Sequence, residues 1–332
     1  MAEGLDIEVA GRLVRLSNPE KVFFKARSET KQDLALYYLA VGEGVLRAVH
    51  DRPTVLKRYP DGAHGKHFYQ KRVPSPPEWL QTVKVAFPSG RSAEELAPAD
   101  LAHVIWAVNL GCLEMHPWPV RRQDLDHPDE LRVDLDPQPG VGLSGVRRVA
   151  EVVREVLVDH GMVGYPKLSG SRGIHIHMRI EPRWDFTEVR RAALGLAREV
   201  ERRTPAATSA WWKEERGERV FVDYNQNARD RTLASAYSVR PNAEATVACP
   251  VTWEELGDVE PPDLTMATVP ARYAKLGDPS ATIDEQAFSL ESLLELAARD
   301  EAEGLGDAPW PPHFPKQRGE PKRVMPSRAR EP

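Results

Sequence analysis

The sequence predicts an α/β protein of the α+β type, with a largely antiparallel or mixed sheet rather than a doubly wound one. Two segments, Gly145 to His160 and Phe186 to Arg203, carry apolar residues at helical spacing and indicate helices that pack against a core. The other segments are mostly short apolar runs that suggest hairpin strands, and the 29 prolines suit many short strands and loops. Hairpins joined by two crossover helices therefore define the expected class.

The N-terminal part combines two helix signals with short strands. Apolar residues recur at helical spacing from Leu34 to Val49, and Thr30 is a suitable cap before them. A second helix is expected over Pro98 to Leu110, with acidic residues near its positive end at Glu94, Glu95 and Asp100. Strands are expected at Thr54 to Tyr59, His67 to Arg72 and Met115 to Val120.

The C-terminal part holds the two periodic helices, the first of which has Gly161 as its stop. Strands are expected at Leu131 to Leu135, Val220 to Tyr224 and Thr232 to Ser238. A short strand is also expected to end at Lys167-Leu168, and the strand after the Ser/Gly turn is expected to end at Arg179 or Ile180. After Arg299 the composition shifts to a Pro-rich basic tail, residues 299–332, which is expected to be extended. Its positive charges are Lys316, Arg318, Lys322, Arg323, Arg328 and Arg330.

Composition excludes several classes of protein. The 332 residues are 41% hydrophobic, enough for a core, but no apolar run reaches the length of a membrane span. The N-terminus lacks the apolar stretch of a signal peptide, and the two cysteines, Cys112 and Cys249, are expected to be reduced core residues in the cytoplasm. A net charge of −5 does not indicate nucleic-acid binding, which depends on a local basic stripe.

The most informative motif is Arg132-Val133-Asp134-Leu135-Asp136-Pro137. Successive side chains of a strand point to opposite faces, so Asp134 and Asp136 would project from the same face and repel each other. Mg²⁺ or Mn²⁺ would offset that repulsion, and Asp223, after another apolar run, is a candidate third ligand. A solvated edge strand or a turn is the alternative explanation of the motif.

The segment Lys167 to His177 strengthens the metal interpretation. Its Ser-Gly-Ser-Arg-Gly turn could direct backbone N–H groups at an anion, and the following strand places His175 and His177 on one face. Metal carboxylates beside such a turn suggest a nucleoside triphosphate. A zinc site at the two histidines has no cysteine or third histidine at ligand spacing, and His177 is expected to be structural or to support the site indirectly.

In combination, seven motifs between about Arg12 and Leu296 resemble the polymerase domain of bacterial LigD, a member of the archaeo-eukaryotic primase superfamily that serves non-homologous end joining. The motifs are Leu-Ser-Asn-Pro-Glu-Lys (16–21), Leu-Lys-Arg-Tyr-Pro (56–60), Glu-Met-His-Pro-Trp (114–118), Asp-Leu-Asp-Pro (134–137), Ser-Gly-Ser-Arg-Gly-Ile-His (169–175), Asp-Tyr-Asn-Gln-Asn (223–227) and Ala-Tyr-Ser-Val-Arg (236–240). The ligase and phosphoesterase modules of that family are absent, so the chain resembles its stand-alone primase-polymerases.

The resemblance implies a primase-polymerase domain over residues 1–298, with a smaller α/β subregion at about 1–125 and a catalytic core with an RRM-like sheet at about 126–298. It also implies template-directed addition of nucleotides, with a preference for ribonucleotides and with Mn²⁺ or Mg²⁺ as cofactor. In two-metal phosphoryl transfer, Asp134 and Asp136 would bridge both ions, and Asp223 would serve the ion at the primer 3′-hydroxyl.

The same resemblance assigns the binding residues. Those expected at the incoming nucleotide are Lys57, His116, Ser169, Ser171, Arg172, His175, Arg231 and Arg240, with His116 at the sugar. A pocket for the 5′-phosphate of a gap is expected at Asn18, Lys21 and Lys31. The template is expected to meet Phe68, Tyr69 and Arg216; because Phe68 and Tyr69 are adjacent on a strand, one of them could instead be a core residue.

The implied partners are gapped or broken DNA with a 5′-phosphate, NTPs and dNTPs, a separate DNA ligase and Ku, with no membrane. The implied location is the cytoplasm, at the bacterial nucleoid. Two other functions remain open at this point. One is a DNA-end-bridging module whose catalysis is secondary; the other is a metal-dependent phosphohydrolase, against which the triphosphate turn argues.

Overall fold

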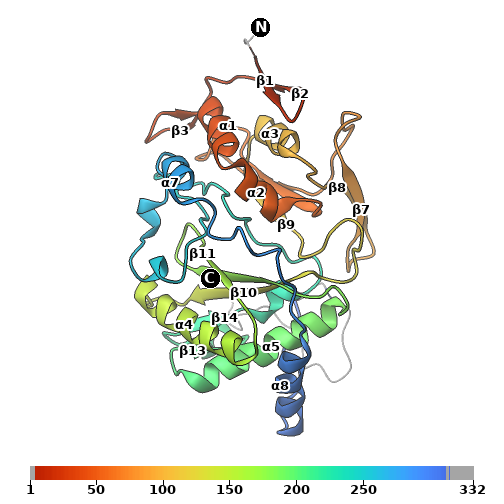
Figure 1. The fold of residues 1–332 in the computed structure, drawn as a ribbon, viewed down its shortest axis with the longest axis vertical. Helices are drawn as coiled ribbons and strands as arrows, with labels where there is room; N and C mark the ends of the chain where they lie inside the picture. The colour runs from red at the N-terminus through yellow and green to blue at the C-terminus, as the bar shows by residue number, and fades with distance from the viewer. Residues whose placement is uncertain (1–3, 312–313, 315–332) are drawn as a thin grey trace.

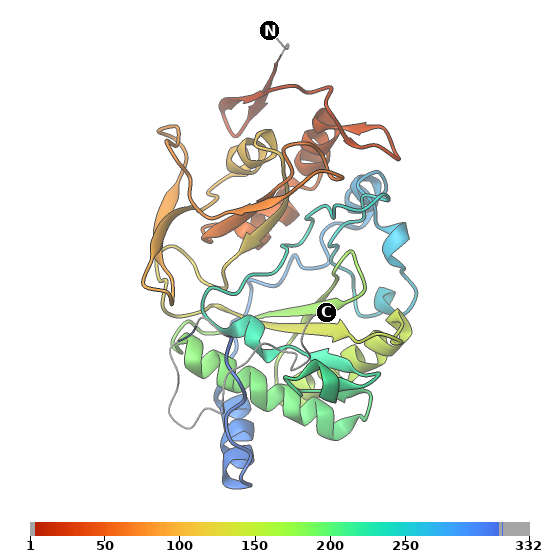
Figure 2. The ribbon, with the colours of Figure 1, turned by 180° about the vertical axis from the view of Figure 1, so that it is seen from behind.

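The computed structural model describes residues 4–311 and 314, which form a mixed α/β structure with two larger sheets (Figure 1). One sheet lies in the N-terminal half and the other in the C-terminal half, with long helices on the outer side of the second sheet (Figures 1 and 2). This confirms the predicted class with mixed strand directions. Among the described residues, no helix is both long and apolar enough to cross a membrane.

The N-terminal half begins with two small hairpins, formed by β1 (Leu5–Val9) with β2 (Arg12–Leu16) and by β3 (Val22–Phe24) with β4 (Glu29–Thr30). Its sheet has the order β6-β5-β8-β7, with β9 on the other edge of β5. The strands are β5 (Thr54–Arg58), β6 (Phe68–Gln70), β7 (Thr82–Ala86), β8 (Ser92–Leu96) and β9 (Cys112–Pro117). The helices are α1 (Lys31–Ala40), α2 (Gly42–Val49) and α3 (Leu101–Asn109).

The single helix predicted over Leu34 to Val49 is wrong, because the chain breaks at Val41 into α1 and α2. A Cβ atom at Gly42 would lie 2.7 Å from the side chain of Leu101, so the second helix starts where the chain passes close to α3. The predicted cap is confirmed: the Thr30 hydroxyl accepts a hydrogen bond from the Asp33 N–H, and the Asp33 carboxylate accepts one from Thr30.

The hairpin of β7 and β8 was not predicted, and it corrects the placement of two acidic residues. Glu94 and Glu95 lie in β8 rather than at the positive end of a helix, and Glu95 is fully buried. Asp100 alone caps α3, where its carboxylate accepts a hydrogen bond from the Ala102 N–H at 3.0 Å. Burial raises the pKa of Glu95 to about 8, which explains how a carboxyl group is tolerated there.

The C-terminal sheet has the order β11-β12-β10-β14-β13. All its pairings are antiparallel except that of β13 with β14. Its strands are β10 (Glu130–Pro137), β11 (Tyr165–Leu168), β12 (Ile174–Arg179), β13 (Ala207–Thr208) and β14 (Val220–Val222), and its covering helices are α4 (Leu143–Asp159) and α5 (Phe186–Arg203). Leu131, Val133 and Leu135 of β10 are buried in the core under these helices, so the alternate residues of β10 face the N-terminal half.

Two of the predicted strands differ in the structure: one is shorter and the other is not a strand. Strand β14 stops at Val222, so Asp223 is not on a strand but caps the 3₁₀ turn η1 (Tyr224–Asn227). Thr232 to Ser238 is not a strand either, because Tyr237 adopts a φ of +66° and the Ser238 N–H bonds back to the Ser235 carbonyl. The segment nevertheless runs beside β9, where the Ser235 N–H donates to the Met115 carbonyl at 2.8 Å.

The short helix α6 (Lys213–Arg216) precedes β14. After η1 the chain continues through η2 (Glu255–Gly257), η3 (Pro261–Asp263), α7 (Val269–Leu276) and α8 (Glu291–Ala302). Helix α7 contacts α1, and α8 packs against α5 (Figure 1). The expected domain end at residue 298 thus falls within α8, whereas the basic residues expected from Lys316 onward lie outside the described residues. Cys112 and Cys249 are buried and free, as predicted.

The contact of α8 with α5 gives a first prediction. A methyl group at Gly195 of α5 would lie 3.0 Å from the Ala297 nitrogen and the Leu293 oxygen, both of which belong to the backbone. We expect Gly195→Ala to lower the free energy of unfolding by about 1–2 kcal/mol, because overpacking outweighs the better helix propensity of alanine. Urea denaturation followed by circular dichroism measures this. Gly257→Ala is the control, since nothing lies within 4 Å of that position; equal stability of both variants would refute the close contact.

Candidate active site

One face of the C-terminal sheet carries a row of ionisable side chains. Arg132, Asp134 and Asp136 alternate with the apolar residues of β10 and share its other face. Strand pairing places Asp134 opposite His175 and Arg132 opposite His177. The next strand, β11, places Lys167 opposite His175. The pairing of β12 with β10 therefore brings the predicted turn and the predicted aspartates together.

The three aspartates are close enough to perturb one another. Burial raises the pKa of Asp134 well above its ordinary value, and the charges of Asp136 and Asp223 raise it further. Burial also raises the pKa of Asp136 and of Asp223. A carboxylate trio that resists ionisation in this way is the electrostatic environment that a divalent cation would relieve, and its oxygen donors fit Mg²⁺ or Mn²⁺.

Asp223 is held by the turn that it caps. Its Oδ1 accepts a hydrogen bond from the Asn225 N–H at 2.9 Å, and its Oδ2 accepts one from the Gln226 side chain at 3.0 Å. Its own N–H donates to the Asp134 carbonyl at 2.9 Å. Within residues 4–311, no three His, Cys, Asp or Glu side chains converge as a ready metal-coordinating group. The carboxylates instead line two pockets that share Asp136.

The first pocket, of about 680 Å³, joins the aspartates to the predicted triphosphate turn. It is lined by His116, Asp134, Asp136, Ser169, Ser171, Arg172, His175 and Arg240, among others. The Ser169 hydroxyl accepts hydrogen bonds from the N–H groups of Ser171 (3.3 Å) and Gly173 (3.1 Å), so those two groups are already used to shape the turn. Gly170 has a φ of +70° and lies against Val247, so only glycine fits there.

Glu114 of β9 organises the cationic side of this pocket. Its buried carboxylate accepts hydrogen bonds from Lys57 (3.0 Å) and Arg240 (2.8 Å) and contacts His116 Nε2 at 3.1 Å. Although burial alone would raise it, the hydrogen bond from His116 and the charges of Arg240 and Lys57 lower the pKa of Glu114 to about 2. Three predicted nucleotide-binding residues from separate strands and loops are therefore fixed by one carboxylate.

The bond to Glu114 determines which atom of His116 is available to a ligand. Burial lowers the pKa of His116, so the ring is neutral and carries a single N–H. Because the ionised Glu114 carboxylate can only accept, we assign the proton to Nε2. The other ring nitrogen, Nδ1, is then an acceptor, and a hydroxyl group is a suitable donor to it.

The second pocket, of about 1510 Å³, opens to solvent on the Asp223 side and contains both Arg216 and Arg231. The charge of Arg231 opposes the rise in the pKa of Asp223. Arg216 is buried, stacks 3.5 Å above the centre of the Phe221 ring, and donates to the carbonyls of Ala210 and Trp211. The structure thus places Arg216 beside the carboxylates, and a role at the template remains a prediction.

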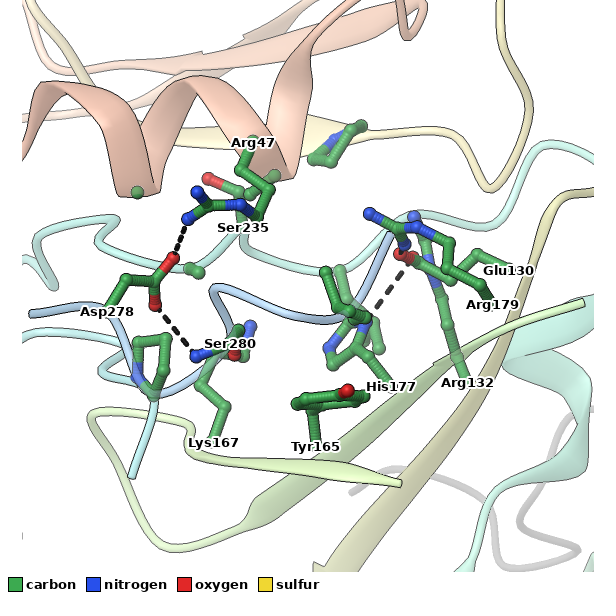
Figure 3. Close-up of a pocket in the computed structure, with 17 residues that line it drawn as sticks. Arg47, Glu130, Arg132, Tyr165, Lys167, His177, Arg179, Ser235, Asp278 and Ser280 are labelled. Carbon is green, nitrogen blue, oxygen red and sulfur yellow. Dashed lines mark hydrogen bonds and ion pairs between the residues drawn. The ribbon is translucent and has the colours of Figure 1, made fainter. Parts of the chain in front are cut away.

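A third cavity lies between the sheet and α2, next to the aspartates, on the face of β10 that carries Glu130 and Arg132 (Figure 3). His177 faces Glu130 across it at 3.3 Å from Nδ1, and Arg132 and Arg179 also pair with Glu130. Lys167 donates to the Ala234 carbonyl, and burial together with the nearby Arg132 and Arg240 charges lowers the pKa of this lysine to about 7. His177 is thus part of a buried charge network rather than of the pocket that holds Asp134.

The residues predicted to bind a 5′-phosphate lie in the N-terminal half. Lys31 is buried, and its ammonium donates to the Ser17 carbonyl at 2.7 Å and to the Asn109 side chain at 2.9 Å. Lys21 is exposed and donates to the Pro60 carbonyl, and Asn18 begins the turn with a φ of +48°. Burial, Lys21 and Arg58 lower the pKa of Lys31 to about 8, which identifies an excess of positive charge there.

Phe68 and Tyr69 are both exposed, by 44% and 54%, so neither is a core residue. They lie on opposite sides of β6. Phe68 stacks against Arg58, toward the Lys31 cluster, and Tyr69 lies edge-on to His116 with ring centres 5.6 Å apart. The aromatic pair therefore stands between the two predicted sites.

Sequence reasoning missed two residues that organise the site, Glu114 and Gln226. Glu114 is two residues before His116, the spacing that puts two side chains on one face of a strand. Gln226 had no signal, because its role depends on the 3₁₀ turn that replaces the expected strand.

Comparisons with known proteins agree with these motifs. The model of the family "LigD, primase-polymerase domain" matches residues 30–280, and so ends before α8. The chain is 33% identical over 292 residues to a multifunctional non-homologous end joining DNA repair protein LigD of Mycobacterium tuberculosis, covering 82% of this chain and 37% of that protein. It is 29% identical over 316 residues to LigD of Mycolicibacterium smegmatis, covering 94% of this chain and 41% of that protein. The chain thus spans less than half the length of these relatives.

A solved structure, the polymerase domain from Mycobacterium tuberculosis ligase D in complex with DNA, has the same fold. Its TM-score is 0.78 at 32% sequence identity, and the match covers 82% of this chain and 99% of that chain. The shared fold extends over both sheets, because the match spans most of this chain.

The Glu114 cluster gives a second prediction. We expect Glu114→Gln to lower the free energy of unfolding at pH 7 by about 3 kcal/mol or more, because Lys57 and Arg240 lose the buried anion that they share. Since the fold lowers the pKa of Glu114, the ionised carboxylate stabilises the protein fully above pH 4.5, and this stabilisation is lost as the pH falls toward 2.

Urea denaturation of both proteins between pH 7 and pH 3 checks this, and the difference between them should shrink as the pH falls. Glu285→Gln is the control, because that side chain is exposed. A difference in stability that stays constant with pH would contradict the assignment of the ionised form to Glu114.

Proposed function

The chain belongs to the LigD primase-polymerase domain family, and from this membership we propose that it is a template-directed nucleotidyltransferase. Its substrates would be ATP and other NTPs, used in preference to dNTPs, and DNA with a short gap or a broken end that bears a 5′-phosphate. The reaction would fill gaps during break or excision repair. The observation that carries the proposal is the pocket in which Asp134 and Asp136 lie beside the Ser169–Arg172 turn.

Metal ions would be held by the oxygens of Asp134, Asp136 and Asp223, whose pKa values are all raised by burial. Divalent cations bound there would supply charge neutralisation of the triphosphate and would make the primer 3′-hydroxyl more acidic. The chain itself contributes the positions: β10 fixes Asp134 and Asp136, and the turn at Asn225 fixes Asp223.

Triphosphate binding would use Arg172, Arg240 and Lys57, which face or adjoin the first pocket. Arg240 and Lys57 share Glu114, so an anionic ligand would enter a site whose cations are already ordered. His175 contacts Asp134 at 3.4 Å, and its lowered pKa, caused by burial and by Lys167, keeps it neutral. A neutral histidine suits a place beside carboxylates that must stay free for a cation.

The proposed ribonucleotide preference follows from the tautomer of His116. With its proton on Nε2 toward Glu114, Nδ1 can accept a hydrogen bond from a ribose 2′-hydroxyl. A deoxyribose cannot donate that bond, so the site would favour NTPs. Tyr69, packed edge-on to His116, would limit the room around the sugar.

DNA binding would use the N-terminal half. Lys21, Lys31 and Arg58 form a cluster of positive charge that a 5′-phosphate would neutralise, in competition with Asp61, which lies 3.7 Å from Lys21. Phe68 lies next to this cluster and would stack on a base at the gap. In a cell, a DNA ligase would seal the product and Ku would deliver the ends; both partners are part of the proposal, whose only support here is that the relatives are non-homologous end joining proteins.

The catalytic proposal predicts that Asp134→Asn abolishes extension without destabilising the protein. We expect single-turnover addition of ATP to a 5′-phosphorylated short gap, with Mn²⁺ or Mg²⁺, to fall by roughly 1000-fold or more. Because the carboxylate of Asp134 is buried among like charges, its raised pKa means that ionisation costs stability at pH 7. The melting temperature of the variant should therefore equal or exceed that of the wild type.

Binding of the same DNA by the variant, measured by fluorescence anisotropy, should be unchanged. Wild-type protein that binds the gap tightly yet adds no nucleotide with either metal would sink the polymerase proposal. That result would favour the alternative, a DNA-end-bridging module, in which the Lys21 and Lys31 cluster carries the function.

The 5′-phosphate proposal makes a separate prediction for Lys21→Ala. We expect the preference for phosphorylated over unphosphorylated gaps to fall about tenfold, because one charge-assisted bond to phosphate is lost. The pKa of Lys31, about 8, adds a pH dependence: the wild-type preference should weaken as the pH rises from 7 to 9 and this ammonium loses its proton. Lys25→Ala, an exposed lysine of the same segment, is the matched control. An equal loss in both variants would point to general charge attraction instead.

A further inference from the structure

Residues 306–310, which follow α8, lie along α5 and are fixed there by a buried arginine. Arg190 of α5 is only 1% exposed. Its guanidinium donates to the Asp307 carboxylate at 2.8 Å and to the carbonyls of Ala308 and Pro309 at 2.8 and 3.2 Å. Trp310 closes this anchor, because its ring lies 4.1 Å from the guanidinium carbon and its indole N–H donates to Asp307 at 2.8 Å.

The same anchor is bonded to the turn that carries Asp223. Arg190 Nε donates to the side-chain oxygen of Asn225 at 2.7 Å, and the Asn225 amide donates to the Pro309 carbonyl at 3.0 Å. The backbone N–H of Asn225 in turn donates to the Asp223 carboxylate at 2.9 Å. Asn225 is therefore a direct link between the C-terminal segment and the third aspartate.

The segment also reaches the pocket itself. Pro311 and Phe314 line the second pocket together with Asp136, Asp223 and Arg231. Phe314 packs against Trp310, with ring centres 5.4 Å apart, so it is part of the same anchored unit. The residues of the triphosphate turn line the other pocket, on the far side of Asp136.

We propose that residues 307–311, together with Phe314, are a C-terminal strap that positions Asp223 through Asn225 and provides an apolar wall for the terminal nucleotide of the primer strand. The proposal rests on the proposed function, in which Asp223 serves the primer 3′-hydroxyl. The primer terminus is the ligand that fits, because this pocket combines the hydroxyl-side carboxylate with an aromatic ring and a proline, whereas the Ser169–Arg172 turn lines the other pocket. The basic side chains of this pocket, Lys213, Arg216 and Arg231, would meet phosphates of the primer backbone. Arg190, Asn225 and Trp310 are positioning residues, since they act through Asp223.

The test releases the strap by the double substitution Asp307→Ala with Trp310→Ala and compares it with Trp310→Phe, which keeps a ring over Arg190. Glu301→Ala is the matched control. It breaks the Arg191–Glu301 ion pair (2.6 Å), which joins α5 to α8, without touching the strap. A truncation that removes residues 316–332 keeps the strap and removes the basic residues from Lys316 onward. Circular dichroism establishes that each variant is folded at the assay temperature.

Three measurements follow on the folded variants: Mn²⁺ binding by electron paramagnetic resonance, amide hydrogen exchange at residues 223–227, and the KM values for gapped DNA and for ATP. In the released variant we expect about tenfold weaker binding of at least one Mn²⁺ ion, faster exchange at 223–227, and a higher KM for DNA with an unchanged KM for ATP. Trp310→Phe, Glu301→Ala and the 316–332 truncation should retain wild-type Mn²⁺ binding.

A released variant that is folded and keeps wild-type Mn²⁺ binding and exchange at 223–227 would overturn the proposal. An equal rise in the KM values for DNA and ATP would also overturn it, because the strap would then support the whole domain rather than the primer side. The Mn²⁺ and exchange measurements need no catalysis. If the wild type adds no nucleotide, the proposed function fails while the strap is still tested by these two measurements.

Discussion

The constraint on which the rest of the site depends is the crowding of three carboxylates near one end of β10, of which Asp134 is buried, Asp223 is half-buried and Asp136 is exposed. When ionised, these carboxylates repel one another, and burial together with the charges of Asp136 and Asp223 raises the pKa of Asp134. Strand pairing on both sides of β10 prevents the first two from moving apart, because each ladder bond would have to break. The crowded carboxylates therefore favour nearby positive charge, which in the proposed function a divalent cation would supply.

Cations near such a site must be kept from pairing directly with the aspartates, and two buried glutamates do this. Glu114 binds Lys57 and Arg240, and so holds these two cations at the rim of the first pocket. Glu130 binds Arg132 and Arg179, together with the neutral His177, and so keeps these two arginines in the cavity next to α2 (Figure 3). The glutamates also join the halves of the molecule, since Lys57 lies in the N-terminal sheet and Arg240 in the C-terminal part.

Much of this could be predicted from local patterns. The helix over Phe186 to Arg203, the aspartate pair and the turn at Ser169 each depend on neighbours within a few residues, and sequence periodicity records those. The hairpin with Glu95 was missed because two adjacent glutamates do not indicate a buried strand position; burial there depends on the packing of other segments. The irregular path of Thr232 to Ser238 likewise follows from bonds to β9, which lies more than a hundred residues earlier.

The position of Asp223 beyond the end of β14 explains why the C-terminal segment matters. A residue within a strand is held by a ladder, as Asp134 is by its pairing with His175, whereas a residue that caps a short 3₁₀ turn is held by a few local bonds. Arg190 compensates for this difference, because its single guanidinium fixes Asn225 from one side and the carbonyls of the strap from the other. Of the three aspartates, the one outside the ladder is thus the one that depends on a distant part of the chain.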